Sequence, residues 1–90
     1  MKRYLVIVDG RVQGVGFRFF CVRHAQLRGV TGSVRNLDNG MVEIFVQGNE
    51  ENINLFLMDI QKGDKFIRVD DMSVKKLNVV DNEREFTYKW

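Results

Sequence analysis

The sequence predicts an α+β fold in which an antiparallel sheet is covered on one face by two helices. The main observation is the order of the segments, which read as strand, helix, strand, strand, helix, strand and a short final strand over 90 residues. A second observation is the Asn39-Gly40 pair between the two middle strands, a strong signal for a hairpin. Because no linker, repeat or low-complexity tract interrupts the chain, we expect residues 1–90 to form one domain.

The first strand and the first helix are predicted from a change in apolar spacing. Residues 3–9 are rich in β-branched and aromatic residues and stop at Gly10, as in a strand. After that, apolar and aromatic side chains recur at helical spacing, and the predicted stripe is Phe17, Phe20, Cys21, His24, Ala25 and Leu27. Gly29 is placed to end this helix in a left-handed conformation.

The middle of the chain predicts a hairpin followed by a second helix. Alternate residues after the Asn-Gly pair are apolar and would share one face of a strand: Val42, Ile44 and Val46. Asn49 can cap the next helix, and Lys62-Gly63 can close it. The predicted buried stripe of this helix is Ile53, Phe56, Leu57 and Ile60.

The remaining residues predict two further strands. Residues 66–80 read as a strand interrupted at Asp70-Asp71, a position that suits a β-bulge. Residues 85–90 alternate aromatic with polar side chains and indicate a last strand. The complete order is that of the split βαβ, ferredoxin-like sandwich, with an antiparallel sheet and both helices on one face.

Composition and charge exclude several classes of function. A formal net charge of only +2 makes a nucleic-acid partner an unfavoured expectation. A single cysteine excludes an internal disulfide and a cysteine-cluster metal site. No stretch approaches the length of a membrane span, and the apolar run after Lys2 and Arg3 ends too early, at Asp9, for a signal peptide. We therefore expect a cytoplasmic protein without a membrane partner.

The stretch "GRVQGVGFR", residues 10–18, is the candidate functional loop. It joins the first strand to the first helix and contains glycines, no carboxylate and an arginine at the helix start. Glycines let consecutive N–H groups point into one concavity, and the first amides of a helix favour an anion. Arg18 adds a planar fork that can grip two oxygens of one anion. From these residues alone, a plain connection between strand and helix remains the simpler interpretation, since glycines at such a junction usually serve only as a connection and a surface arginine is usually solvated. The loop also matches neither a dinucleotide fingerprint nor a P-loop.

Two motifs together resemble the acylphosphatase family. "GRVQGVGFR" and the later "GSVRNLDNGMVEIFVQG" match the family's glycine-rich loop before a helix and its V-R-N strand leading into a turn, and the similarity covers essentially the whole chain. The chain departs from the family pattern at Ser33, where an aromatic residue is usual, at Asn39, where aspartate is common, and in lacking prolines after the second helix. These differences concern packing and turns.

The resemblance implies an enzyme, an acylphosphate phosphohydrolase that hydrolyses the carboxyl–phosphate bond without metal, cofactor or covalent intermediate. Arg18 and the backbone amides of residues 14–18 would hold the phosphoryl group, and Asn36 would orient the attacking water. The residues implied in phosphate binding are Gly14, Val15, Gly16, Phe17 and Arg18. The partner would be a small-molecule acyl phosphate, bound by a monomer. Without the resemblance, Asn36 reads as an ordinary turn residue.

Two other functions share this predicted fold. The sequence "GVGFRFF" superficially echoes the glycine-aromatic signature of RNA-recognition motifs, but there the aromatics lie on a central strand, whereas here they follow a helical period. A regulatory domain that binds a small molecule is the third reading, because fold does not fix function. His24 and Cys21 are interpreted as packing residues, since no partner cluster for metal or catalysis accompanies them.

Overall fold

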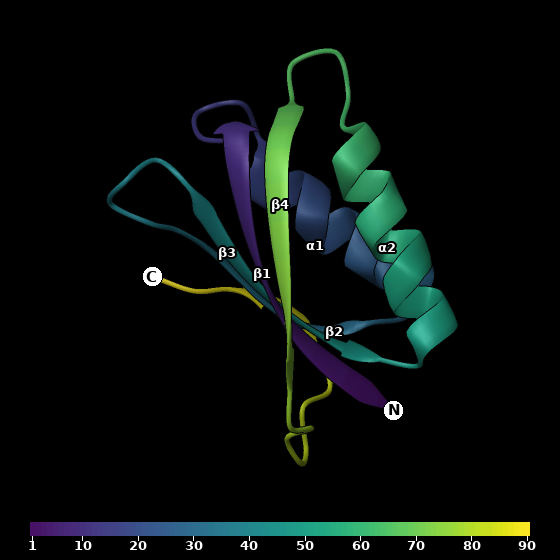
Figure 1. The fold of residues 1–90 in the computed structure, drawn as a ribbon. Helices are drawn as coiled ribbons and strands as arrows, with labels where there is room; N and C mark the ends of the chain where they lie inside the picture. Colours follow the sequence, from purple (N-terminus) through teal and green to yellow (C-terminus); the bar gives the residue numbers. More distant parts are fainter.

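Two helices cover one face of a five-stranded sheet (Figure 1). The computed structural model describes residues 1–90. Along the chain the elements are β1 (Lys2–Arg11), α1 (Phe17–Arg28), β2 (Thr31–Asn36), β3 (Val42–Gly48), α2 (Glu50–Lys62), β4 (Arg68–Leu77) and β5 (Phe86–Tyr88). The strands lie in the order β4-β1-β3-β2-β5. The predicted ferredoxin-like fold class is confirmed.

The sheet is antiparallel in its four main strands and gains one parallel pair. β1 pairs antiparallel with β3 and β4, and β2 pairs antiparallel with β3. β5 pairs parallel with β2, so the whole sheet is mixed. From the sequence we expected an antiparallel sheet, and this parallel pair was not predicted. The parallel pair arises because residues 78–85 carry the chain from β4 to the opposite edge, where β5 then runs beside β2 in the same direction.

The core lies between the sheet and the helices. It contains sixteen buried hydrophobic residues, among them Val42, Ile44 and Val46 as predicted. Each helix contributes three: Phe17, Cys21 and Ala25 from α1, and Ile53, Phe56 and Ile60 from α2. The predicted stripes were too wide, since Phe20, His24 and Leu57 are half-buried. Leu27 is 69% exposed because it lies about 200° around the helix axis from Ala25.

Local signals in the sequence place the ends of both helices correctly, whereas the strand ends differ from the prediction: β1 continues through Gly10 to Arg11, and β4 and β5 are shorter than the predicted 66–80 and 85–90. The Asn49 side chain accepts a hydrogen bond of 2.8 Å from the Asn52 amide at the start of α2. Gly29 ends α1 with φ 68°, and Gly63 ends α2. The bulge is confirmed, because Asp9 pairs with Asp71 and Gly10 with Val69, which leaves Asp70 as the extra residue of β4.

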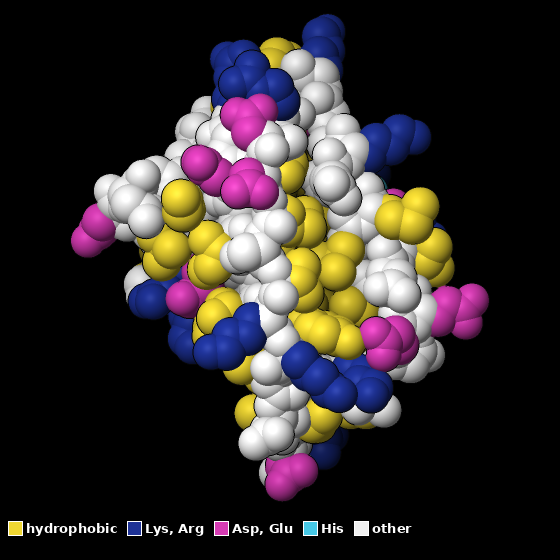
Figure 2. Space-filling model, in the orientation of Figure 1, with side chains coloured by type: hydrophobic (Ala, Val, Ile, Leu, Met, Phe, Trp, Pro, Cys, Tyr) yellow, Lys and Arg dark blue, Asp and Glu magenta, His cyan; other side chains and the backbone are white.

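Strand β4 forms one edge of the sheet and is only partly covered by α2. Figure 2 shows apolar side chains gathered between this strand and the helix, where Val69, Met72 and Leu57 are half-buried against the core. The strand also carries exposed charged residues, which oppose pairing with another sheet edge: Arg68, Asp70, Asp71, Lys75 and Lys76. Neither helix is long and apolar enough to cross a membrane.

Candidate active site

The loop after β1, the end of β2 and strand β5 meet around a small pocket. Its volume is about 210 Å³. In Figure 1 the loop after β1, the turn between β2 and β3 and the C-terminus all lie on the left of the molecule. The residues that line the pocket include no carboxylate: Val12, Gly14, Gly16, Phe17, Arg18, Phe19, Asn36 and Tyr88. An anion that enters this pocket therefore meets no negative side chain.

The loop backbone leaves a run of amides without protein partners. Gly14 and Gly16 adopt φ angles of 74° and 79°, which L-residues with a side chain rarely adopt. A Cβ at either position would meet nothing within 4 Å, so both glycines face open space. The first backbone bond of α1 runs from the Phe20 amide to the Gly16 carbonyl at 3.0 Å, and no side chain caps the helix. The preceding amides and the helix dipole together favour a bound anion.

Arg18 is an arginine without an acidic partner. Its side chain forms no ion pair, whereas Arg3, Arg28, Arg35 and Arg68 each contact a carboxylate. The guanidinium instead lies near an aromatic ring, with its carbon 5.3 Å from the centre of the Trp90 ring. The five N–H donors of the guanidinium are thus available to a ligand in the pocket.

Asn36 reaches the same pocket from the last position of β2. The residue is exposed and its side chain makes no hydrogen bond within the protein. Its place opposite the loop is held by Gln13, whose Nε2 donates to the carbonyl oxygens of Leu37 and Met41, at 2.9 Å each. Sequence reasoning missed this link. Gln13 lies within the quoted loop, but a sequence contains no signal for a partner 24 or 28 positions away.

The other predicted site residues differ in what they bring to the pocket. Phe17 is 1% exposed and belongs to the core, so only its backbone is available to a ligand. The Val15 side chain packs against the core and does not line the pocket. Phe19 and Tyr88 do line it, although no sequence motif indicates a role for Tyr88. Tyr88 comes from β5, and its position depends on the parallel pairing with β2 that was not predicted.

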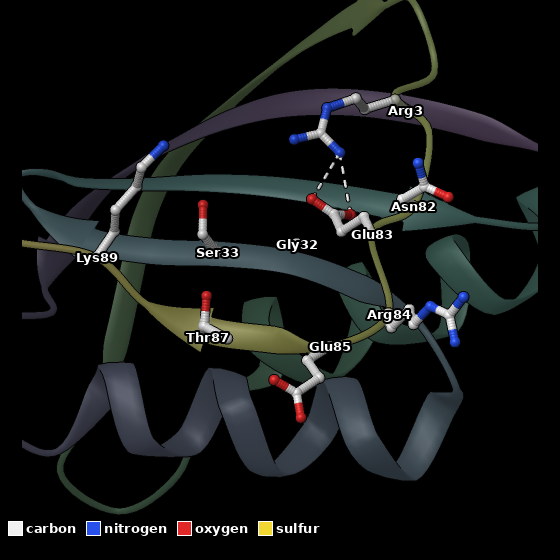
Figure 3. A pocket seen from close by; sticks show the side chains of 9 residues that line it. All are labelled: Arg3, Gly32, Ser33, Asn82, Glu83, Arg84, Glu85, Thr87 and Lys89. Atoms are coloured by element: carbon white, nitrogen blue, oxygen red, sulfur yellow. Dashed lines mark hydrogen bonds and ion pairs between the residues drawn. The ribbon is translucent and has the colours of Figure 1, made fainter.

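A larger pocket of about 530 Å³ lies on the other face of the sheet (Figure 3). Its most buried cation, Arg3, already binds Glu83 at 3.0 Å and Gln47 at 3.2 Å. Glu83 and Glu85 also line it, beside Arg84 and Lys89, so an anion in this pocket meets negative as well as positive side chains. This pocket is therefore less suited to a phosphate than the smaller one, despite its size.

A cluster of three ionisable side chains, His24, Arg28 and Asp59, joins the two helices. Asp59 of α2 accepts hydrogen bonds from Arg28 at 2.7 and 2.9 Å and contacts His24 at 3.0 Å. The Arg28 guanidinium, helped by His24, lowers the pKa of Asp59 to about 2. His24 also stacks against Phe20, and the thiol of Cys21 is buried, which raises its pKa. These residues are engaged with one another or in packing, in agreement with the structural interpretation.

Comparison with known proteins identifies the family. The model of the acylphosphatase family matches residues 4–88. The chain belongs to the acylphosphatase family. It is 48% identical to the acylphosphatase of Clostridium acetobutylicum over 86 residues, which cover 96% of this chain and 94% of that protein. It is 46% identical to the acylphosphatase of Bacillus licheniformis over the full length of both.

A solved structure supports the same relationship. The crystal structure of acylphosphatase from Bacillus subtilis superposes with a TM-score of 0.94 at 39% identity and covers 100% of both chains. The resemblance recognised in the sequence is thus confirmed. As a member of this family, the chain is an enzyme that hydrolyses acyl phosphates, a hydrolase acting on acid anhydrides. Its substrates are small molecules.

Proposed function

We propose that the amides of residues 14–18 and the guanidinium of Arg18 bind the phosphoryl group of the acyl phosphate, while Asn36 orients the attacking water. The observation that carries this assignment is the convergence of the loop, Arg18 and Asn36 on one pocket without a carboxylate. The phosphate would be gripped by Gly14, Val15, Gly16, Phe17 and Arg18, with the side chains of Val15 and Phe17 serving only to hold their amides in place.

The chemistry of an acyl phosphate needs few groups from the protein. The oxygen of water attacks phosphorus, the bond from phosphorus to the carboxyl oxygen breaks, and the electron pair leaves with the carboxylate, while the two protons of the water remain on the inorganic phosphate. Since a carboxylate is a good leaving group, the enzyme has to position the reactants and stabilise the charge on the phosphoryl oxygens. Amides and a guanidinium already aligned before the reaction supply that stabilisation.

Asn36 suits the task of directing the water. Its side-chain carbonyl can accept a hydrogen bond from the water and its NH2 group can donate one to the water oxygen, and neither capacity is used within the protein. Gln13 fixes the turn that follows Asn36 to the phosphate loop, so the water and the phosphoryl group would be held by parts of one rigid unit.

Replacement of Arg18 tests the proposal. Arg18→Gln should raise both KM and the inhibition constant of inorganic phosphate and lower kcat, because the guanidinium contacts the phosphoryl group before and during the reaction. Arg18→Lys should restore little, since a point charge does not match two oxygens. The matched control is Arg23→Gln, an exposed arginine of the same helix outside the pocket. Near-normal kcat/KM in Arg18→Gln would show that the assignment is wrong.

We further infer that the enzyme acts as a cytoplasmic monomer that does not bind nucleic acid. The unpaired, buried Cys21 fits a reducing compartment. The low net charge and the pairing of Arg3 with Glu83 leave the outer face of the sheet poorly suited to a polyanion. Sedimentation equilibrium tests whether the enzyme is a monomer, and an RNA-binding titration tests whether it binds nucleic acid. A dimer would contradict the first inference, and saturable RNA binding would contradict the second.

A further inference from the structure

Trp90, the single tryptophan of the chain, lies beside Arg18, one of the residues that line the pocket. The indole is 91% exposed, and the guanidinium carbon of Arg18 is 5.3 Å from the centre of its ring. This distance is within the range of a cation–π contact, for which tryptophan is the best partner. None of the roles proposed above uses Trp90.

The backbone up to residue 89 is fixed beside the strand that carries Asn36. Val34 of β2 pairs with Tyr88, and the Lys89 amide donates to the Val34 carbonyl at 2.9 Å. Successive side chains of an extended segment point to opposite sides. Tyr88 lines the pocket, whereas Lys89 lies over Phe45 on the outer face of the sheet, with its Nζ 5.6 Å from the ring centre. The alternation therefore returns Trp90 to the side of the pocket.

We propose that Trp90 is a positioning residue that holds the guanidinium of Arg18 in the orientation that binds phosphate. This inference rests on the proposed role of Arg18. An arginine side chain has many rotamers, and an aromatic ring against the guanidinium restricts them before the substrate arrives. A preorganised guanidinium loses less entropy on binding, so the enzyme binds every phosphate ligand more tightly.

An aromatic partner suits this arginine better than a carboxylate would. Arg28 and Arg35 are held by Asp59 and Glu43, which occupy N–H donors and cancel the positive charge. A cation–π contact uses no N–H donor, and the indole carries no charge that would repel the phosphate. Arg18 can thus be restrained by Trp90 and remain fully available to the substrate.

The alternative is that the indole contacts the acyl group, and inorganic phosphate separates the two roles because it has no acyl group. We expect Trp90→Ala and Trp90→Leu to raise the inhibition constant of phosphate and the KM of acetyl and benzoyl phosphate by one common factor of about two- to fivefold. Trp90→Phe should keep most of the wild-type affinity, since it retains an aromatic face. A KM that rises only for benzoyl phosphate, or a Trp90→Leu enzyme with wild-type constants, would overturn the proposal.

Lys89→Ala is the matched control, because Lys89 is the adjacent residue but points to the other face of the sheet. It should leave all three constants unchanged, and circular dichroism verifies that each variant is folded. Comparison with Arg18→Gln separates the two proposals. If Arg18→Gln binds phosphate normally, the role of Arg18 is wrong; if it binds weakly while Trp90→Leu binds normally, only the role of Trp90 is wrong.

Intrinsic fluorescence gives a second, independent readout. Because the chain has one tryptophan, its emission reports on the surroundings of the Trp90 ring, which include the guanidinium of Arg18. Addition of phosphate should change the emission saturably, with a midpoint equal to the inhibition constant, whereas chloride at the same ionic strength should not. The change should disappear in Arg18→Gln. An emission that does not respond to phosphate in the wild-type enzyme would contradict contact between Trp90 and the phosphate-binding guanidinium.

Discussion

At the scale of single residues, Arg18 and Asn36 have different expected effects on binding and turnover. Arg18 would grip the phosphate throughout the reaction, whereas Asn36 would act mainly on the water as the transition state forms. Neither side chain forms a hydrogen bond to a carboxylate or to the backbone, so replacement of either removes no hydrogen bond from the fold. Their roles can therefore be separated by kinetics.

Asn36→Ala should lower kcat by about two to three decades, the equivalent of roughly 2.7–4 kcal/mol, by analogy with the loss of one preorganised polar group. The inhibition constant of phosphate should change little. Steady-state kinetics with phosphate as inhibitor measures both. The control is Asn39→Ala in the same turn, which removes the bond of 3.0 Å from the Met41 amide and should reduce stability while leaving kcat intact. Full activity in folded Asn36→Ala would leave Asn36 as a turn residue.

At the scale of elements, side-chain bridges determine how the pieces of the site lie relative to one another. Gln13 links the loop after β1 to the turn between β2 and β3 through two bonds of 2.9 Å. Asp59 links α2 to α1 through Arg28 and His24. The first bridge lies next to the pocket and the second is remote from it, so their loss should have different consequences.

Gln13→Ala should reduce both turnover and stability. Loss of two hydrogen bonds to backbone carbonyls should cost about 1–2 kcal/mol of unfolding free energy. Because Asn36 is then less firmly aligned with the phosphate loop, kcat should fall between about threefold and about tenfold. Kinetics and urea unfolding test this, with Gln61→Ala, an exposed glutamine of α2, as the control. An unchanged kcat would show that the bridge does not position the site.

Asp59 should make the fold sensitive to acid. Its pKa falls from the ordinary 3.8 to about 2 in the folded protein, so its contribution is complete above about pH 4 and is lost as the pH falls through about 2. The contribution should be roughly 1–2 kcal/mol. Urea unfolding across this range should show a weaker pH dependence in Asp59→Asn than in the wild type. Identical pH dependence in both would contradict the assignment.

At the scale of the whole molecule, a bound anion should stabilise the fold. Phosphate at a hundredfold excess over its dissociation constant should add roughly 2.7 kcal/mol of unfolding free energy. For a domain of this size that raises Tm by roughly 10–20 °C. Thermal unfolding in phosphate and in chloride at equal ionic strength provides the comparison, with Arg18→Gln as the control that loses the difference. An equal response to both salts would argue against a specific site.

The sequence predicts most of the fold because its signals are local. Apolar periodicity, the Asn49 cap, the glycines after both helices and the Asn-Gly turn act within a few residues of one another. The width of the buried stripes and the parallel pairing of β5 depend on distant elements, and these were the points at which the structure differed, at Leu27 above all.

The candidate site was predictable only in part, for the same reason. The glycine loop and Arg18 are adjacent in sequence, and their position at the start of a helix predicts that they bind an anion. Two side chains that complete the pocket come from other strands: Asn36 was identified only through the family resemblance, and Tyr88 belongs to β5. Trp90, which follows β5, lies beside Arg18. Gln13 lies within the candidate loop, but its hydrogen-bond partners, which are distant in sequence, were not predicted.

The most direct measurement of where phosphate binds is a titration of the ¹⁵N-labelled protein followed by amide NMR. The account predicts saturable shifts that are largest for the backbone amides of residues 14–18 and the side-chain amide of Asn36, with a dissociation constant equal to the inhibition constant of phosphate. The larger pocket around Arg3 and Glu83 should be unaffected. Largest shifts at that pocket, with the loop of residues 14–18 unmoved, would contradict the proposed active site.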